Sequence, residues 1–125
     1  MPKGVVRPTD IRLHQQSRVL EIAFEDGTSY RLPCEYLRVY SPSAEVRGHG
    51  PGQEVLQVGK ENVNIAAIEP VGAYAVRLRF DDGHDTGLYS WEWLHNLAVN
   101  YDTLWRQYQE RLDLAGIKRE PAAAR

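Results

Sequence analysis

The sequence DDGHD, from Asp81 to Asp85, places one histidine among acidic side chains at a predicted turn. A carboxylate that steers an imidazole is a common arrangement in catalytic and metal sites. His84 is therefore a candidate general base or metal ligand. The same residue types are also typical of a solvated turn, so the pattern leaves both interpretations open.

Cys34 is the one cysteine of the chain, and a single thiol forms no internal disulfide. With His84 or His95 as its base, this thiol is a candidate nucleophile, although single cysteines are usually inert residues of a core. Another alternative is a mixed metal site drawn from Cys34, His49, His84 and His95. These residues lack the paired spacing that is typical of zinc ligands.

Four side chains are candidates for contact with a partner: Arg38, Tyr40, Trp91 and Trp93. Trp91 falls on the apolar face of the helix predicted after Ser90, where its ring is expected to be buried. Trp93 lies on the flank of that helix and is the better candidate for a partly exposed contact. Arg38 precedes a predicted loop, where its guanidinium could meet an anionic group.

The chain has 125 residues, which predicts one domain at residues 6–119 with flexible ends at 1–5 and 120–125. Its formal net charge of −2 provides no basic field for nucleic acid or for an anionic membrane surface. No apolar run reaches the roughly 20 residues that a membrane span requires. Because the first residues lack the apolar segment of a secretory signal, we expect a cytoplasmic protein.

Alternating polar and apolar residues predict strands, and Asp26-Gly27 and Asp82-Gly83 are typical of tight turns between them. After Ser90 the apolar spacing changes to that of helices, with a break at 100–102 and an end at Gly116. The predicted fold is α+β: an antiparallel β-sheet with two Asp-Gly hairpins and C-terminal helices packed on it. The predicted strands cover residues 10–14, 19–25, 28–33, 55–58, 63–69 and 74–80.

The connection between the two predicted hairpins is less regular. Residues 41–53 contain two prolines and three glycines, which predicts a loop. The preceding residues 34–40 are compatible with either a short helix or an irregular turn. The candidate contact residues Arg38 and Tyr40 therefore lie next to this loop in the sequence.

Long stretches of the chain resemble a known family: RPTDIRL, FEDGTSYRLPCEYLRVYSPSAEVRGH and IEPVGAYAVRLRFDDGHDTGLYSWEWL. They are similar to the short bacterial proteins of the DUF971 family, named for their likeness to the N-terminal domain of gamma-butyrobetaine hydroxylase. In the hydroxylase, this small domain precedes a separate catalytic domain that holds iron and 2-oxoglutarate. Since the resemblance covers the small domain alone, it implies a protein without hydroxylase activity.

The small domain of the hydroxylase also holds a structural zinc ion through three cysteines and one histidine. The resemblance places those cysteines at Ser41, Ser43 and Val46, and it leaves only the histidine, as His84. A serine hydroxyl is a poor zinc ligand and valine offers none, so we predict that the zinc site is lost. We expect no cofactor, with an association with iron as the alternative.

Similar domains also occur fused to P-loop ATPases of the iron–sulfur carrier type, which implies a partner protein connected with iron–sulfur handling. We therefore predict a non-catalytic interaction module that docks on a partner or oligomerises through residues 36–46 and the region of Trp91 and Trp93, without nucleic acid or membrane partners. One alternative is a metal-binding accessory protein that uses His84 with His49 and Cys34. Another is a small hydrolase or transferase in which Cys34 or His84 is catalytic.

Overall fold

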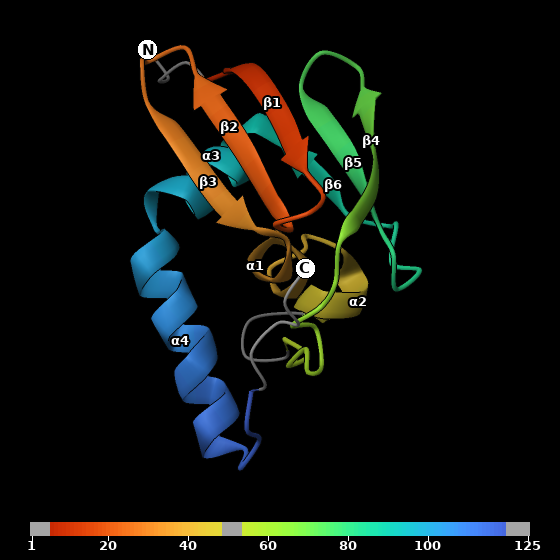
Figure 1. Cartoon of the computed structure of the whole chain (residues 1–125), viewed down its shortest axis with the longest axis vertical. Coiled ribbons are helices and arrows are strands. Elements are labelled where there is room, and N and C mark those ends of the chain that lie inside the picture. Colours follow the sequence, from red (N-terminus) through yellow and green to blue (C-terminus); the bar gives the residue numbers. More distant parts are fainter. Residues whose placement is uncertain (1–5, 49–53, 120–125) are drawn as a thin grey trace.

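The computed structural model describes residues 6–48 and 54–119, and its strands form two antiparallel sheets that lie side by side (Figure 1). Within these residues the strand orders are β1-β2-β3 and β4-β5-β6. The strands are β1 (Pro8–His14), β2 (Val19–Phe24), β3 (Ser29–Pro33), β4 (Ile65–Val71), β5 (Ala75–Phe80) and β6 (Leu88–Ser90). The predicted antiparallel α+β fold is confirmed, with two sheets in place of one. The flexible ends predicted at 1–5 and 120–125 lie outside the described residues.

The first sheet follows from the strict alternation of buried and partly covered residues along β2. Leu20, Ile22 and Phe24 are buried, while the residues between them are only partly covered. The chain reverses at Asp26-Gly27, where Gly27 has a φ of 87° that favours glycine. The Asp26 carboxylate accepts a hydrogen bond from the Thr28 backbone N–H at 3.0 Å, which fixes the turn before β3.

The second sheet places the other Asp-Gly pair in a longer connection. Residues 81–87 join β5 to β6, and Gly83 has a φ of 91°. The Phe80 N–H donates to the carbonyl oxygen of His84 at 2.9 Å, so the chain turns tightly there and then runs on to β6. This connection carries His84 toward the segment that follows the first helix.

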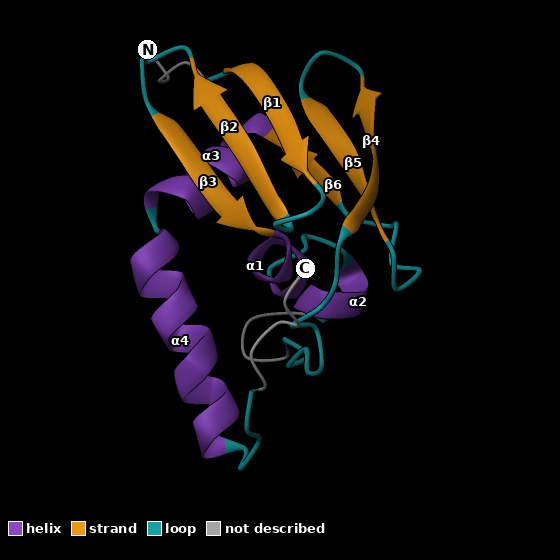
Figure 2. Ribbon diagram, viewed as in Figure 1, coloured by secondary structure: helices purple, strands orange, loops and turns teal. Residues whose placement is uncertain are grey.

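The helices are α1 (Cys34–Val39), α2 (Ala44–Arg47), α3 (Trp91–Val99) and α4 (Tyr101–Leu114) (Figure 2). Ser90 caps α3, because its hydroxyl oxygen accepts the Trp93 N–H at 3.1 Å. The predicted break lies at Asn100, and Gly116 follows α4 with a φ of 72°. α3 packs against β3 and β6. No helix in the described parts of the chain is long and apolar enough to cross a membrane.

Two segments differ from the sequence predictions. The predicted loop at 41–53 contains one helical turn, α2, because the Ser43 hydroxyl caps the N–H of Glu45 at 3.2 Å. Residues 55–58 are not a strand, although the Val55 N–H bonds the Val46 carbonyl oxygen at 2.8 Å. Both differences concern the chain between the two sheets.

Two buried tyrosine hydroxyls hold α1 inside the fold. The main core cluster combines side chains from both sheets with α1 and α3. Tyr36 donates its hydroxyl to the Leu97 carbonyl oxygen at 2.6 Å, and Tyr89 donates to that of Leu37 at 2.6 Å. Buried hydrogen bonds of this kind fix both the position and the direction of α1. The residues after α1 are therefore placed against the connection that carries His84.

Candidate functional site

His84 and Ser41 form a buried hydrogen-bonded pair. The Ser41 Oγ lies 2.9 Å from His84 Nε2, and the His84 side chain is only 2% exposed. Ser41 Oγ also accepts the backbone N–H of Ser43 at 3.2 Å. A side chain at Gly87 would overlap Ser41 Oγ, so glycine at that position permits the close approach of the two segments.

A contact between two hydroxyl groups lies beside the pair formed by Ser41 and His84. The Ser43 Oγ is 2.8 Å from the Thr86 Oγ1, and the Thr86 hydroxyl donates to Glu45 Oε1 at 3.3 Å. Ser41, Ser43, His84 and Thr86 together are called here the serine–histidine cluster. It joins the chain after α1 to the connection between β5 and β6.

The His84 imidazole is held in an environment that favours its neutral form. Burial lowers the His84 pKa below 6.5, and the Arg38 charge lowers it further, while Glu45 and Asp82 act in the opposite direction. Glu45 Oε2 lies 3.3 Å from Nδ1, yet Nδ1 makes no hydrogen bond of acceptable geometry within the described residues. Because the Glu45 side chain is 66% exposed, water screens its charge and the burial effect dominates.

Serine, imidazole and carboxylate follow one another here in the order of a nucleophilic triad: Ser41, His84 and Glu45. A nucleophile must also reach its substrate. Ser41 is only 1% exposed, and its oxygen is already occupied by His84 and by the Ser43 N–H. The arrangement thus fits a structural link better than a catalytic group.

Of the positions that the resemblance assigned to zinc ligands, Ser41 and His84 are in contact and Ser43 lies beside Ser41, but their donors do not fit zinc. Ser41 and Ser43 supply hydroxyls, His84 supplies one imidazole, and the buried Val46 supplies no donor. Zinc is normally held by thiolate, imidazole or carboxylate groups. In residues 6–48 and 54–119, no three His, Cys, Asp or Glu side chains form a group that could hold a metal ion.

The other candidate ligands lie apart from His84. Cys34 is buried, with its Sγ 3.8 Å from Asn64 Oδ1, and burial raises the pKa of its thiol to about 11. His95 lies 3.6 Å from the Asp26 carboxylate at the first turn. His49 falls outside the described residues. The structure therefore brings neither Cys34 nor His95 to the serine–histidine cluster.

Arg38 lies inside the protein, where it binds the connection that carries His84. Its side chain is 8% exposed and donates to Asp82 Oδ2 at 2.9 Å and to Gln57 Oε1 at 3.0 Å. Lys60 reaches the same Asp82 oxygen at 2.7 Å. Burial alone would raise the Asp82 pKa, but the hydrogen bonds from Lys60, the His84 N–H and Arg38 outweigh it and lower that pKa to about 2.

The two tryptophans of α3 have different surroundings. Trp91 donates its indole N–H to the Ala73 carbonyl oxygen at 2.8 Å, beside the turn between β4 and β5. Trp93 donates to the Tyr40 carbonyl oxygen at 3.0 Å, and the Arg47 guanidinium lies 5.5 Å from the centre of its ring. The structure thus brings Trp93 and Tyr40 together, with Trp91 and Arg38 elsewhere.

Trp93 borders two cavities. The first cavity, of about 580 Å³, is lined by Tyr40, Val46, Arg47, Trp93 and Arg111 among others. The second cavity, of about 540 Å³, is lined by Pro42, Arg47, Leu88 and Trp93 among others. Cavities that bind small ligands have similar volumes. Tyr40, Pro42, Arg47, Leu88 and Trp93 are called here the Trp93 surface.

Sequence reasoning missed several residues of these sites. Gly87 and Thr86 lie in an ordinary polar turn sequence, and nothing in it signals their contacts with Ser41 and Ser43. Arg111 resembles any charged residue of a surface helix, since its place at the first cavity depends on the packing of α4. The helical turn α2 could have been found from the capping residue Ser43.

Comparison with known proteins gives one family and several solved structures. Residues 11–95 match the family described as gamma-butyrobetaine hydroxylase-like, N-terminal. One NMR solution structure is 53% identical, covers 100% of this chain and 94% of the other, and has a TM-score of 0.82. A second NMR solution structure is 48% identical, covers 97% of this chain and 95% of the other, and has a TM-score of 0.81.

A crystal structure is also similar, that of an Acidithiobacillus ferrooxidans protein of unknown function from the DUF971 family. It is 41% identical, covers 74% of this chain and 92% of the other, and has a TM-score of 0.62. No curated protein matches the chain.

Proposed function

Because the chain belongs to the DUF971 family of gamma-butyrobetaine hydroxylase-like N-terminal domains, we propose that it is a non-catalytic module that docks on another protein. The proposed docking site is the Trp93 surface. Domains that this chain resembles occur fused to P-loop ATPases of the iron–sulfur carrier type, so iron–sulfur carrier proteins are the first partners to test.

The observation that carries this proposal is the pair of cavities that share Trp93 in their linings. Both are lined by Pro42, Arg47 and Trp93, so one partner could fill both hollows at once. Leu88 adds an apolar side chain that is 49% exposed. Tryptophan and arginine are enriched among the residues that dominate binding energy at protein interfaces.

The serine–histidine cluster supports a docking role in a different way. It holds the chain after α1 against the connection that leads to β6, and these segments supply Pro42 and Leu88. We propose that the cluster takes the structural place of the zinc ion, has no catalytic role, and holds the Trp93 surface in position. A surface that is rigid before binding loses less entropy when a partner docks.

The proposal is tested by photo-crosslinking from the Trp93 surface. A photoreactive amino acid at Leu88 captures neighbouring proteins in the cell, and the same group at Leu114, which is 89% exposed, serves as the control. A protein captured only from position 88 is then purified, and its affinity for the chain is measured.

Arg47→Glu and Leu88→Glu are expected to weaken that affinity by about tenfold or more, since each places a charge at the contact. Leu114→Glu, the matched control, is expected to leave it unchanged. Equal affinity for all three variants would contradict docking at the Trp93 surface.

The alternative metal-binding role, linked to iron or iron–sulfur handling, depends on His84. It has one supporting observation: the buried Nδ1 makes no hydrogen bond within the described residues. Titration of the chain with Zn²⁺ and Fe²⁺, followed by the imidazole NMR signals, separates the two proposals. A shift of the His84 signals at stoichiometric metal supports the alternative, and unchanged signals exclude it.

A further inference from the structure

We infer that the first cavity is a carboxylate-binding site, and that it takes an acidic side chain beside an apolar one in an extended segment of the partner. This inference rests on the proposed function and specifies the chemistry of the partner. Its starting point is the charge of the lining. Arg47 and Arg111 face one acid, Glu54, among the described lining residues, on a chain whose formal net charge is −2.

The two arginines are available to a ligand. Neither Arg47 nor Arg111 has a carboxylate partner within residues 6–48 and 54–119. The guanidinium carbon of Arg47 lies 5.5 Å from the centre of the Trp93 ring, and the attraction of a cation to a ring face takes up none of its N–H donors. Arginine donors of this geometry bind a carboxylate through two parallel hydrogen bonds.

The other side-chain hydrogen-bond donors that line the first cavity are already satisfied. The Tyr40 hydroxyl donates to the Leu104 carbonyl oxygen at 2.7 Å, and the Trp93 indole N–H donates to Tyr40 itself. The Ser41 hydroxyl is taken by His84. The unused donors are thus guanidinium groups, which selects an anionic acceptor over a neutral one.

The remaining lining selects the part of the ligand next to the anion. The apolar part of the lining comes from Val46, which is buried, from Val55, which is 51% exposed, and from Trp93. An aliphatic or aromatic side chain next to the acidic one would cover this apolar surface. An extended segment provides both groups on one face when the acidic and the apolar residue are two positions apart, because successive side chains point to opposite faces.

The test uses the whole chain, isotope-labelled, and follows the Trp93 indole signal in NMR. The probe is a pool of short synthetic peptides in which Asp or Glu lies two positions from Leu, Val or Phe, so that both side chains share one face of an extended segment. A matched pool carries Asn and Gln at the acidic positions. At about 1 mM peptide, the acidic pool is expected to shift the Trp93 signal and the neutral pool is expected to leave it unchanged.

Two charge reversals at the cavity and one control locate the site. Arg47→Glu and Arg111→Glu are each expected to abolish the shift, whereas Arg106→Glu, an exposed change on the same helix as Arg111, is expected to preserve it. Added salt is expected to weaken the shift. Equal shifts with both pools, no shift with either pool, or equal loss in the Arg106 variant would overturn the inference. Capture of a partner at Leu88 combined with no effect of the acidic pool would overturn this inference alone and leave the docking function standing.

Discussion

The Ser41 hydroxyl and the His84 imidazole are 43 positions apart in the sequence, and their polar atoms lie 2.9 Å apart inside the protein. Two segments that belong to different halves of the chain therefore meet through a hydrogen bond between two side chains. Because both groups are buried, loss of either one leaves the other without its partner.

Ser41→Ala is expected to destabilise the protein by roughly 1–3 kcal/mol, because Nε2 of His84 and the N–H of Ser43 both lose their contact with the hydroxyl oxygen. Urea unfolding measures the change. Ser29→Ala, at an exposed position of β3, is the control and is expected to stay within about 0.5 kcal/mol of the wild type. Equal unfolding free energies for the two variants would contradict a stabilising role of the Ser41 hydroxyl.

Stability is expected to fall between pH 7 and pH 5 because of His84. Burial lowers its folded-state pKa below the ordinary 6.5, so the unfolded chain binds the proton first as the pH falls. The contribution of His84 is complete above pH 6.5 and is lost as the pH decreases through the folded pKa. The lowered pKa of Asp82, about 2, acts only below the ordinary value of 3.8, in a separate range.

Unfolding free energies of the wild type and of His84→Gln at pH 7 and pH 5 check this expectation. The variant is expected to lose less stability over that interval, because glutamine does not titrate. An equal loss in both proteins would show that other groups cause the pH dependence.

Cys34 is expected to be unreactive in the folded protein. A rise of its thiol pKa from 9.0 to about 11 lowers the thiolate fraction near neutral pH by roughly 100-fold, and burial hinders access further. Alkylation by iodoacetamide, with and without denaturant, measures the difference. Comparable rates in the two conditions would reopen the interpretation of Cys34 as a nucleophile.

The triple variant Ser41→Cys, Ser43→Cys and Val46→Cys is expected to bind one zinc ion together with His84. Three thiolates and one imidazole form a donor set that zinc prefers. The structure brings position 41 to His84 and position 43 to position 41, and the Val46 N–H bonds the Ser43 carbonyl oxygen at 3.0 Å. Competition with a chromophoric chelator measures the affinity.

The matched control for zinc binding is Ser17→Cys, Ser29→Cys and Val99→Cys, which exchanges the same residue types at exposed positions. It is expected to bind zinc more weakly by orders of magnitude, because its thiols do not converge. Similar affinity of the two triple variants would show that residues 41, 43 and 46 do not form a ligand set with His84.

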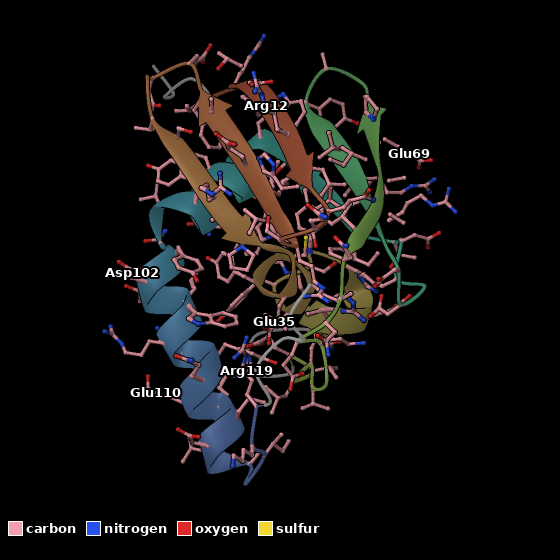
Figure 3. The ribbon with its side chains drawn as sticks, viewed as in Figure 1. Arg12, Glu35, Glu69, Asp102, Glu110 and Arg119 are labelled. Atoms are coloured by element: carbon pink, nitrogen blue, oxygen red, sulfur yellow. The ribbon has the colours of Figure 1, made fainter. Side chains whose placement is uncertain are left out.

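Arg119→Ala is expected to cost roughly 1–3 kcal/mol, because it leaves the Glu35 carboxylate buried without its charged partner. The guanidinium donates from Nε to Glu35 Oε2 at 2.8 Å and through a second nitrogen to Oε1 (Figure 3). It also lies over the Trp105 ring. The Glu35 side chain is only 5% exposed. Glu35→Gln in the same background is expected to restore part of the loss, as measured by urea unfolding. No recovery would indicate that the contact with Trp105 carries the effect.

The strands and helices were largely predictable, because short-range patterns determine them. The alternation in β2 and the Ser90 cap of α3 are both readable without knowledge of the fold. The division into two sheets was not predictable, since it depends on which strands pair, and alternation is the same in either case. Arg38 shows a similar limit, because burial of an arginine depends on a distant partner, here Asp82.

The candidate site was predictable only in part. The resemblance pointed to Ser41, Ser43, Val46 and His84 as a group. The structure places Ser41 against the His84 imidazole and Ser43 against Thr86. The sequence predicted a buried Trp91 and a partly exposed Trp93, and the structure leaves both residues partly buried. The first cavity and the place of Arg111 in its lining depend on how α4 packs on α1, which no local pattern contains.

Gly87 has a consequence for how such sequences diverge. A methyl group at this position would lie 2.4 Å from the Ser41 oxygen and 3.2 Å from the Tyr89 ring, so an alanine there requires the Ser41 hydroxyl to move or to be absent. Substitution of Gly87 is therefore expected to be tolerated better after a smaller residue has arisen at position 41. Evolutionary change at one position thus depends on the residue at the other, although the two are 46 positions apart in the sequence.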